Sequence, residues 1–311
     1  MPRMSQIVSI AHLTDVHLGP IEGFHPRYWN LKRGAGFMNW VHKRRDGHRR
    51  DVLDRIVADM LARNPDHIAV TGDLANIGLP QEHAAALTWL EGLGPPDRVS
   101  VVPGNHDIYS TIGRDAGTRR WARYMTSDAE GSQFDSGDDF PFVRLLGRIA
   151  LVGVNSSVPT PVLLAYGRVG ARQLARLEDV LTRLGKAGLF RLVLIHHPPL
   201  TGLANAARGL RDAKDLEAVL SRAGAELVMH GHNHRNMFAW HLHRTGRMAI
   251  IGAPSASQAV QHGAEQLARY NVYRIDAAAR SIEMTGRGLA EPDGEVVDLE
   301  RRTLSPSPRA A

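Results

Sequence analysis

The stretch VSVVPGNHD at residues 99–107 holds the clearest sign of how this chain is organised. Its β-branched run is typical of a short buried strand, which the Pro-Gly pair after it would end. Asn105, His106 and Asp107 would then lie on the turn at the carboxyl end of that strand. An amide, an imidazole and a carboxylate are poor material for a core. The stretch therefore predicts a functional turn, provided that partners converge on it from elsewhere in the chain.

Four other strand-like runs also end in polar side chains. The runs are IVSIAHLT, HIAVTG, RLVLI and ELVMHG, and the polar residues just after them are Asp15 and His17, Asp73, His196 and His197, and His232 and His234. Helical patterns lie between several of these runs, at residues 49–64, 80–94, 170–188 and 210–224. Ligands of open α/β sheets bind outside the carboxyl ends of the strands, so these side chains can converge although they are far apart in sequence.

The alternation of strands and helices, with nearly continuous apolar strands, predicts an α/β fold with buried sheets. A chain of 311 residues can bury a substantial core, and no repeat or linker divides it. We therefore expect a single domain over residues 1–303, with an inserted basic and aromatic segment at about 24–50. Residues 304–311 are poor in apolar side chains, which predicts a disordered tail.

The composition limits the chemistry that the chain can perform. It has no cysteine, which excludes disulfides, thiolate ligands and a cysteine nucleophile, whereas its 16 histidines can supply metal ligands. The net charge of +6 suits an anionic, phosphate-bearing partner. No apolar run is long enough to span a bilayer and the first residues lack the pattern of a signal peptide, so we expect a cytoplasmic protein.

The polar residues at the strand ends suit two metal ions. Asp73 has two oxygens to share between two cations, and Asn105 offers a neutral carbonyl oxygen. The remaining side chains bring the set to about seven ligands: Asp15, His17, His196, His232 and His234. Two cations roughly 3.5–4 Å apart can clamp a phosphoryl group and generate hydroxide near neutral pH. His106 is then placed to donate a proton to the leaving oxygen. Each motif alone is a weak signal, but five in order at strand ends favour a site.

The order DxH, GD, GNHD, H and GHxH resembles the calcineurin-like metallophosphoesterase superfamily, over about residues 7–255. The resemblance implies a four-layer α/β/β/α sandwich of two mixed sheets, with a dinuclear site at the carboxyl ends of the strands. It implies one metal held by Asp15, His17, Asp73 and His234, and another held by Asp73, Asn105, His196 and His232. It also implies in-line attack of metal-bound hydroxide on phosphorus. Manganese is the first choice of metal, with iron, zinc or magnesium as alternatives.

Four neighbouring residues complete the predicted site. Asn76 occupies the place where related enzymes often carry an acid that orients the catalytic histidine, and Asp107 could take that role instead. We expect His197 to line the site. Arg168 is a candidate cation for offsetting charge on the phosphoryl group.

The segment at residues 24–50 is the feature that the motifs leave unexplained. Between residues 27 and 50 it has eight Lys or Arg against one acid, interleaved with aromatic residues that include two of the five tryptophans. Tryptophan with basic residues is typical of an element at a membrane interface. We therefore expect Arg27 and Trp29 to bind substrate over the site, although ordinary core aromatics with a solvated basic face would have the same composition.

Four functions are compatible with these observations. The first is hydrolysis of the pyrophosphate in a lipid-linked nucleotide such as UDP-2,3-diacylglucosamine, at the inner face of the membrane. The second is a 3′,5′-cyclic nucleotide phosphodiesterase, with the segment as a lid. A nuclease is less favoured because no separate nucleic-acid module is evident. A non-catalytic scaffold is less favoured because all seven ligands and His106 are present. The sequence does not determine the oligomeric state.

Overall fold

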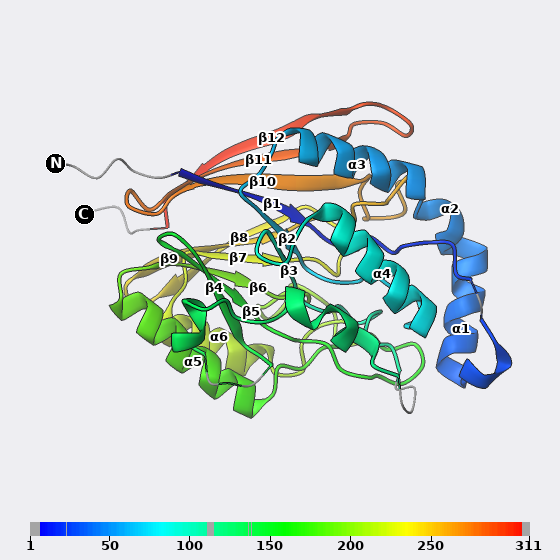
Figure 1. The fold of residues 1–311 in the computed structure, drawn as a ribbon, viewed down its shortest axis with the longest axis horizontal. Coiled ribbons are helices and arrows are strands. Elements are labelled where there is room, and N and C mark those ends of the chain that lie inside the picture. The colour runs from blue at the N-terminus through cyan, green and yellow to red at the C-terminus, as the bar shows by residue number, and fades with distance from the viewer. Residues whose placement is uncertain (1–6, 23, 111–114, 136, 138, 307–311) are drawn as a thin grey trace.

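Two mixed sheets of six strands lie face to face, with helices on the outer side of each (Figure 1). The structure is a computed structural model that describes residues 7–22, 24–110, 115–135, 137 and 139–306. The layers follow the order α/β/β/α, which confirms the predicted fold class. Among the described helices, none combines the length and the apolar character needed to cross a membrane.

The first sheet combines three parallel strands from the N-terminal half with three antiparallel strands from the C-terminus. Its strands, in spatial order, are β12 (Val296–Leu304), β11 (Ser281–Leu289), β10 (Arg269–Asp276), β1 (Ile7–Leu13), β2 (His67–Val70) and β3 (Val99–Val101). The sequence analysis identified β1 to β3 but not β10 to β12. These last strands lack a continuous apolar run, because only part of their residues face the core.

The second sheet has four parallel strands between two antiparallel edges. Its strands, in spatial order, are β4 (Phe142–Leu146), β5 (Ile149–Gly153), β6 (Phe190–Leu194), β7 (Leu227–His230), β9 (Gly246–Gly252) and β8 (Met237–His243). Parallel pairing joins β5, β6, β7 and β9. The carboxyl ends of these strands therefore meet at one edge of the sheet, which is where the predicted histidines follow β6 and β7.

Four amphipathic helices cover the outer faces of the sheets (Figure 1). Helices α3 (Arg50–Ala62) and α4 (Pro80–Leu93) accompany the first sheet, and α5 (Ala171–Lys186) and α6 (Ala213–Ala223) pack on the second. The buried residues of α5 recur every three or four positions and form one apolar stripe, which consists of Leu174, Leu177, Val180, Leu181 and Leu184. Helix α4 begins with Pro80 in its first turn and ends before Gly94, in the manner that the sequence predicts.

Residues 24–48, here called the cap, lie beside the ends of the sheets (Figure 1). The cap contains the 3₁₀ turn η1 (Pro26–Tyr28), helix α1 (Leu31–Asn39), the π-helix η2 (Trp40–Arg44) and the short helix α2 (Arg45–Gly47). Its aromatic residues Trp40, Phe37, Phe24 and Tyr28 pack with Ile21, Ile77 and Leu79 in a small separate core. The guanidinium of Arg33 is buried and donates to the carbonyls of Ile77, Gly78 and Ser110. Part of the basic and aromatic composition therefore serves to dock the cap.

Two irregular segments complete the chain. The 3₁₀ helices η3 (Gly117–Tyr124) and η4 (Gly131–Gln133) lie in the long connection between β3 and β4. Leu304 is the last residue of β12, and the carbonyls of Ser305 and Pro306 accept hydrogen bonds from Arg247. Ordered structure thus extends three residues past the predicted boundary at 303, and residues 307–311 lie outside the described residues.

Candidate metal centre

The seven predicted ligands converge on one buried site. Each lies directly after a strand, on the loops that follow β1, β2, β3, β6 and β7, and each is at most 5% exposed: Asp15, His17, Asp73, Asn105, His196, His232 and His234. Two sheets contribute, because the first three strands belong to one sheet and the last two to the other. The parallel strands thus bring residues from the two halves of the chain together at one edge.

The backbone is strained where these side chains are presented. Five of the seven residues have a left-handed backbone conformation, with φ of 51° at Asp15, 42° at His17, 55° at Asp73, 70° at His232 and 51° at His234. Such conformations cost about 1–3 kcal/mol for a residue other than glycine and cluster at functional sites. The nearby glycines permit close approach. A Cβ at Gly104 would overlap the carboxylate of Asp73, and one at Gly231 would overlap Asp15.

Two pairs of imidazole nitrogens have the spacing of ligands on a common ion. Nε2 of His17 lies 3.3 Å from Nε2 of His234, and Nε2 of His196 lies 3.2 Å from Nδ1 of His232. Two tetrahedral nitrogen ligands about 2.0–2.1 Å from a metal are roughly 3.3 Å apart. Oδ1 of Asp15 is 3.1 Å from Nε2 of His234. We call Asp15, His17 and His234 the first cluster.

The second cluster consists of His196, His232 and Asn105. Oδ1 of Asn105 lies 2.8 Å from Nδ1 of His232 and 3.1 Å from Nε2 of His196, so one amide oxygen faces both rings. The carboxylate of Asp73 is placed to serve both clusters, because its oxygen lies within 4.8 Å of the ligand atoms of His196 and His232 and also of those of Asp15 and His17. The donor set therefore fits two divalent ions that share one carboxylate.

Hydrogen bonds behind the rings fix which nitrogen faces the site. Nδ1 of His17 contacts the carbonyl of Ala75 at 3.2 Å, and Nδ1 of His196 contacts the carbonyl of Thr71 at 2.6 Å. Because a carbonyl can only accept, these contacts place a proton on Nδ1 and direct Nε2 into the site. This is the support that metal-ligating histidines usually have.

The charges of the site are arranged around the two carboxylates. Burial alone would raise the pKa of Asp15, but the charge and the hydrogen bond of His234 hold that pKa well below its usual value. Burial alone would lower the pKa of His196, but the charge of Asp73 raises it to about 9. Both effects show that the site favours positive charge beside each carboxylate, which is what bound cations would supply.

His106 lies at the edge of this site and is oriented by backbone. Nδ1 of His106 contacts the carbonyl of Asn76, and the amide of His106 donates to Oδ1 of Asp73 at 2.7 Å. Asn76 therefore acts through its backbone carbonyl, while its side-chain amide donates to Leu18. Nε2 of His106 accepts from the guanidinium of Arg44 at 2.9 Å. Burial, followed by the charge of Arg44, lowers the pKa of His106 to about 3.

Asp107 supports the turn of Asp73 and does not orient His106. Its carboxylate accepts four backbone N–H groups at 2.8–2.9 Å, from Asp73, Leu74, Ala75 and Gly104. Burial and the charge of Asp73 raise the pKa of Asp107 to about 7. The sequence placed the residue correctly beside the site, but its side chain turns toward the loop that carries Asp73.

The four predicted substrate-binding residues occupy different surroundings. His197 is buried behind His232, with Nδ1 2.8 Å from Ser156 Oγ and Nε2 3.2 Å from the carbonyl of Ala165, so both ring nitrogens already have partners. Arg168 is exposed, and its amide donates to the carbonyl of Ser156 at 2.8 Å. Arg27 and Trp29 lie on the outer surface of the cap, where Arg27 contacts the Tyr28 ring and Trp29 stacks on Phe24. The ring of His197 thus packs against both imidazoles of the second cluster, and the substrate-binding roles of Arg168, Arg27 and Trp29 stay predictions.

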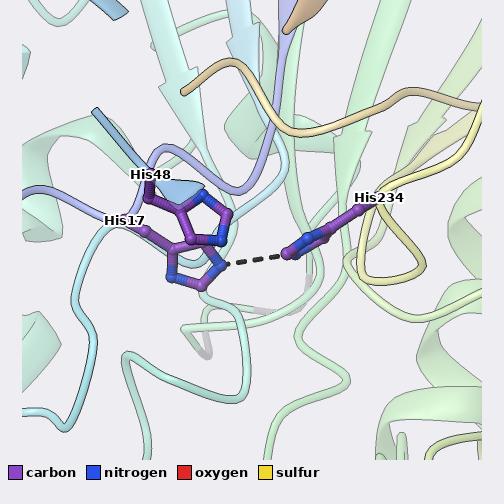
Figure 2. Close-up of side chains that lie close together, drawn as sticks. All are labelled: His17, His48 and His234. Carbon is purple, nitrogen blue, oxygen red and sulfur yellow. Dashed lines mark hydrogen bonds between the residues drawn. The ribbon is translucent and has the colours of Figure 1, made fainter. Parts of the chain in front are cut away.

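Three residues that the sequence analysis did not assign also lie beside the clusters. Arg44 contacts His106, and Arg208 donates to the carbonyl of His232 at 2.7 Å, so two guanidiniums flank the site. His48 of the cap lies beside His17 and across from His234 (Figure 2). The π-helix η2, closed by the hydrogen bond from the Arg45 amide to the Trp40 carbonyl, ends at Arg44 and precedes His48 in the cap. Arg44 and His48 lie in the run KRRDGHRR, which has no motif or periodic pattern that would identify them as site residues.

A cavity of about 450 Å³ opens next to the first cluster. It is lined by His48 and His234, by further residues of the cap, and by Gln258, Val260, His262 and Glu265. The cap side includes Asn39, His42 and Arg44. Cavities of about 300–1,000 Å³ are the usual size for small-molecule sites. The cavity therefore provides room for a small substrate that reaches the candidate metals.

The fold and the site together define a dinuclear metallophosphoesterase. The chain belongs to the calcineurin-like phosphoesterase family, whose model matches residues 8–236. A probable cyclic nucleotide phosphodiesterase from a Synechococcus species is 24% identical over 242 residues, which cover 77% of each chain. A glycerophosphodiester phosphodiesterase, GpdQ, from Enterobacter lignolyticus is 27% identical over 229 residues, which cover 72% of this chain and 70% of that protein.

Solved structures of similar fold include two phosphatases. A dimetal phosphatase from Danio rerio aligns with a TM-score of 0.63 at 16% identity, over 96% of this chain and 99% of that chain. The purple acid phosphatase PPD1 of yellow lupin (Lupinus luteus) aligns with a TM-score of 0.55 at 13% identity, over 98% of this chain and 55% of that chain. At these identities the likeness concerns the fold alone. The expected enzyme class, a hydrolase of phosphoester bonds, is confirmed by the family.

Proposed function

We propose that this protein is a phosphodiesterase that hydrolyses small diesters, with a 3′,5′-cyclic nucleotide as the first candidate substrate. The observation that carries the proposal is the small cavity between the cap and residues 258–265, which adjoins the first cluster and has Arg44 on its wall. A single phosphodiester with a nucleoside attached matches a cavity of this size. The two phosphodiesterases among the relatives support a diester over a monoester.

The residues of the two clusters would hold the ions. In this proposal Asp15, His17 and His234 hold one ion, the second cluster holds the other, and Asp73 contributes to both. A pair of divalent ions supplies a nucleophile from water near neutral pH and offsets charge on the phosphoryl oxygens. We expect manganese, since its ions accept mixed carboxylate, amide and imidazole donors, and iron, zinc or magnesium are the alternatives.

His106 would protonate the leaving oxygen. Its Nδ1 proton is committed to Asn76, so Nε2 is the atom that must carry the transferred proton. Nε2 now accepts from Arg44. A phosphate anion in the site would attract that guanidinium away from the ring and would raise the pKa of His106, because negative charge favours the imidazolium. Substrate binding thereby makes the acid available.

A lipid-linked nucleotide such as UDP-2,3-diacylglucosamine is the second candidate, on a separate observation. The outer face of the cap exposes large apolar side chains next to basic ones: Trp29, Leu31, Met38 and Val41. Trp29 is 56% exposed and Leu31 80% exposed. Apolar and aromatic side chains interleaved with arginine and lysine suit the inner face of an anionic membrane. In this proposal residues 24–48 are the cap of a single catalytic domain that works at that surface.

Substrate comparison tests the proposal. The manganese-loaded enzyme would be given 3′,5′-cyclic AMP, a glycerophosphodiester and UDP-2,3-diacylglucosamine in detergent, with metal content measured in the same samples. We expect hydrolysis of cyclic AMP with the highest kcat/KM. Asp73→Ala is the control and should lose metal and activity together. Preference for the lipid substrate would favour the second candidate, and a fully metallated enzyme without turnover of any of the three would overturn both.

A further inference from the structure

The cap brings a third imidazole to the first cluster. We propose that His48 is a ligand of the metal ion held by Asp15, His17 and His234, so that the cap itself completes the metal site. The inference rests on the proposed function, since it assumes that this cluster holds an ion. It adds an eighth side chain to the seven that the sequence motifs supply.

The distances place His48 among the ligand atoms. One ring nitrogen each of His17, His48 and His234 lies within 4.8 Å of the others. The ring of His48 is 4.5 Å from that of His17 and 5.3 Å from that of His234, measured between centroids (Figure 2). Nitrogen ligands about 2.0–2.1 Å from one ion lie at most roughly 4 Å apart. A shift of the ring by less than an ångström or so would therefore bring His48 into a common coordination sphere.

The hydrogen bonds of His48 leave the correct nitrogen free. In the described structure both contacts of its ring use Nδ1, at 2.9 Å from Ser257 Oγ and 3.3 Å from Ser255 Oγ. Nε2 is therefore available to a cation. His17 has the same arrangement, with Nδ1 held from behind and Nε2 directed inward. Such outer partners fix the tautomer and the ring orientation of metal-binding histidines.

The backbone around His48 is anchored without its side chain. The amide of Arg49 donates to the Ser257 carbonyl at 3.0 Å, and the amide of Ala259 donates to the Gly47 carbonyl at 2.7 Å. These contacts pair the end of the cap with the loop after β9 on both sides of the histidine. Anchoring the cap therefore does not require an imidazole at this position, whereas binding a metal ion from this position does.

Ser255 connects His48 to the first cluster by a second route. Its Oγ donates to the carbonyl of Asp15 at 2.5 Å and also lies near Nδ1 of His48. Ser255 therefore contacts both Asp15, a residue of the first cluster, and His48 of the cap. If His48 binds the ion, metal occupancy and the position of the cap become linked, and Arg44, whose carbonyl accepts the amide of His48, moves with it.

Cobalt binding provides the test, because Co²⁺ absorption reports the ligands directly. Wild-type protein, His48→Ala and His42→Ala would be titrated with Co²⁺, and the binding isotherm and the d–d spectrum recorded. His42 is the matched control, because it lies on the cap and lines the same cavity but is exposed. We expect His48→Ala to bind one of its two ions at least tenfold more weakly with an altered spectrum. His42→Ala should match wild type.

Two further measurements separate ligation from a structural role. Free imidazole added to His48→Ala should restore the spectrum of the weakened ion, which an anchoring role would not allow. Hydrogen exchange of the amides of residues 31–47 should slow on metal addition in wild type and much less in His48→Ala. Unchanged Co²⁺ affinity and an unchanged spectrum in His48→Ala would overturn the inference. Weaker binding of both ions that imidazole does not restore would also overturn it.

Failure of the dinuclear site, on which the proposed function depends, would look different. In that case wild-type protein would bind fewer than two ions, and Asp73→Ala would bind as wild type does. If instead wild type binds two ions and His48→Ala retains both unchanged, the dinuclear site stands and only the role of His48 is lost.

Discussion

Replacing Asp107 by asparagine should destabilise the turn that presents Asp73 and thereby weaken metal binding. The carboxylate of Asp107 is 3% exposed and accepts four backbone amides. Oδ1 accepts those of Leu74 and Ala75, and Oδ2 accepts those of Asp73 and Gly104. An asparagine has one oxygen, and its NH₂ group is a donor. Whichever way the amide is turned, two backbone N–H groups therefore lose their acceptor and face another donor.

The size of the effect follows from that count. A buried polar group left without a partner costs about 1–3 kcal/mol, so two unpaired amides cost roughly 2–6 kcal/mol. The left-handed conformation of Asp73 adds to the sensitivity, because these same hydrogen bonds hold it in place. Relaxation of the turn would relieve the unpaired amides but would move the carboxylate of Asp73 away from the two clusters. Either outcome lowers stability, metal affinity or both.

Urea unfolding and metal titration of Asp107→Asn would measure both effects. The matched control is Asp212→Asn, since Asp212 also accepts backbone amides, from Val169 and Gly170 at the start of α5. That control should lose some stability with its metal affinity unchanged. If Asp107→Asn unfolds within about 1 kcal/mol of wild type and binds manganese equally well, the supporting role argued for this carboxylate is wrong.

Three other changes have distinct expected results. His106→Ala should keep both metals and lower kcat by about 10²–10⁴, most strongly for poor leaving groups, which steady-state assays with graded leaving groups would detect. Arg44→Gln should lower kcat/KM roughly tenfold to a hundredfold through loss of a charged phosphate contact, and equal kcat/KM would contradict its role. Burial, followed by the charge of Arg144, lowers the pKa of His67 to about 3. Below pH 6.5 His67 therefore binds a proton in the unfolded chain but not in the folded chain, and this residue alone lowers stability by about 1.4 kcal/mol per pH unit down to pH 3. His67→Gln should show a correspondingly shallower dependence in urea unfolding at pH 7 and pH 5.

Most of the ordered framework could be predicted from the sequence. Strands β1, β2, β3, β5, β6, β7 and β9 and helices α3 to α6 each have an apolar pattern of the right period, because each buries one face or both. The ligands could be predicted for a related reason. Parallel strands end at a common edge, so polar residues after successive strands must lie near one another once the strands are known. The partly exposed strands β10 to β12 have no such continuous run and were missed.

The sequence by itself determined the class of chemistry, since the donor types and their order after the strands are local properties. Only the tertiary structure decided which cap residues face the site. The run KRRDGHRR has no periodic pattern, and residues of the cap differ in where they point. Trp29 is exposed, whereas Arg44 reaches His106 and His48 reaches the first cluster. The difference arises because the cap docks through Arg33 and its aromatic core and through pairing with residues 257–259. Those contacts join segments that lie far apart in the chain, and no local pattern encodes them.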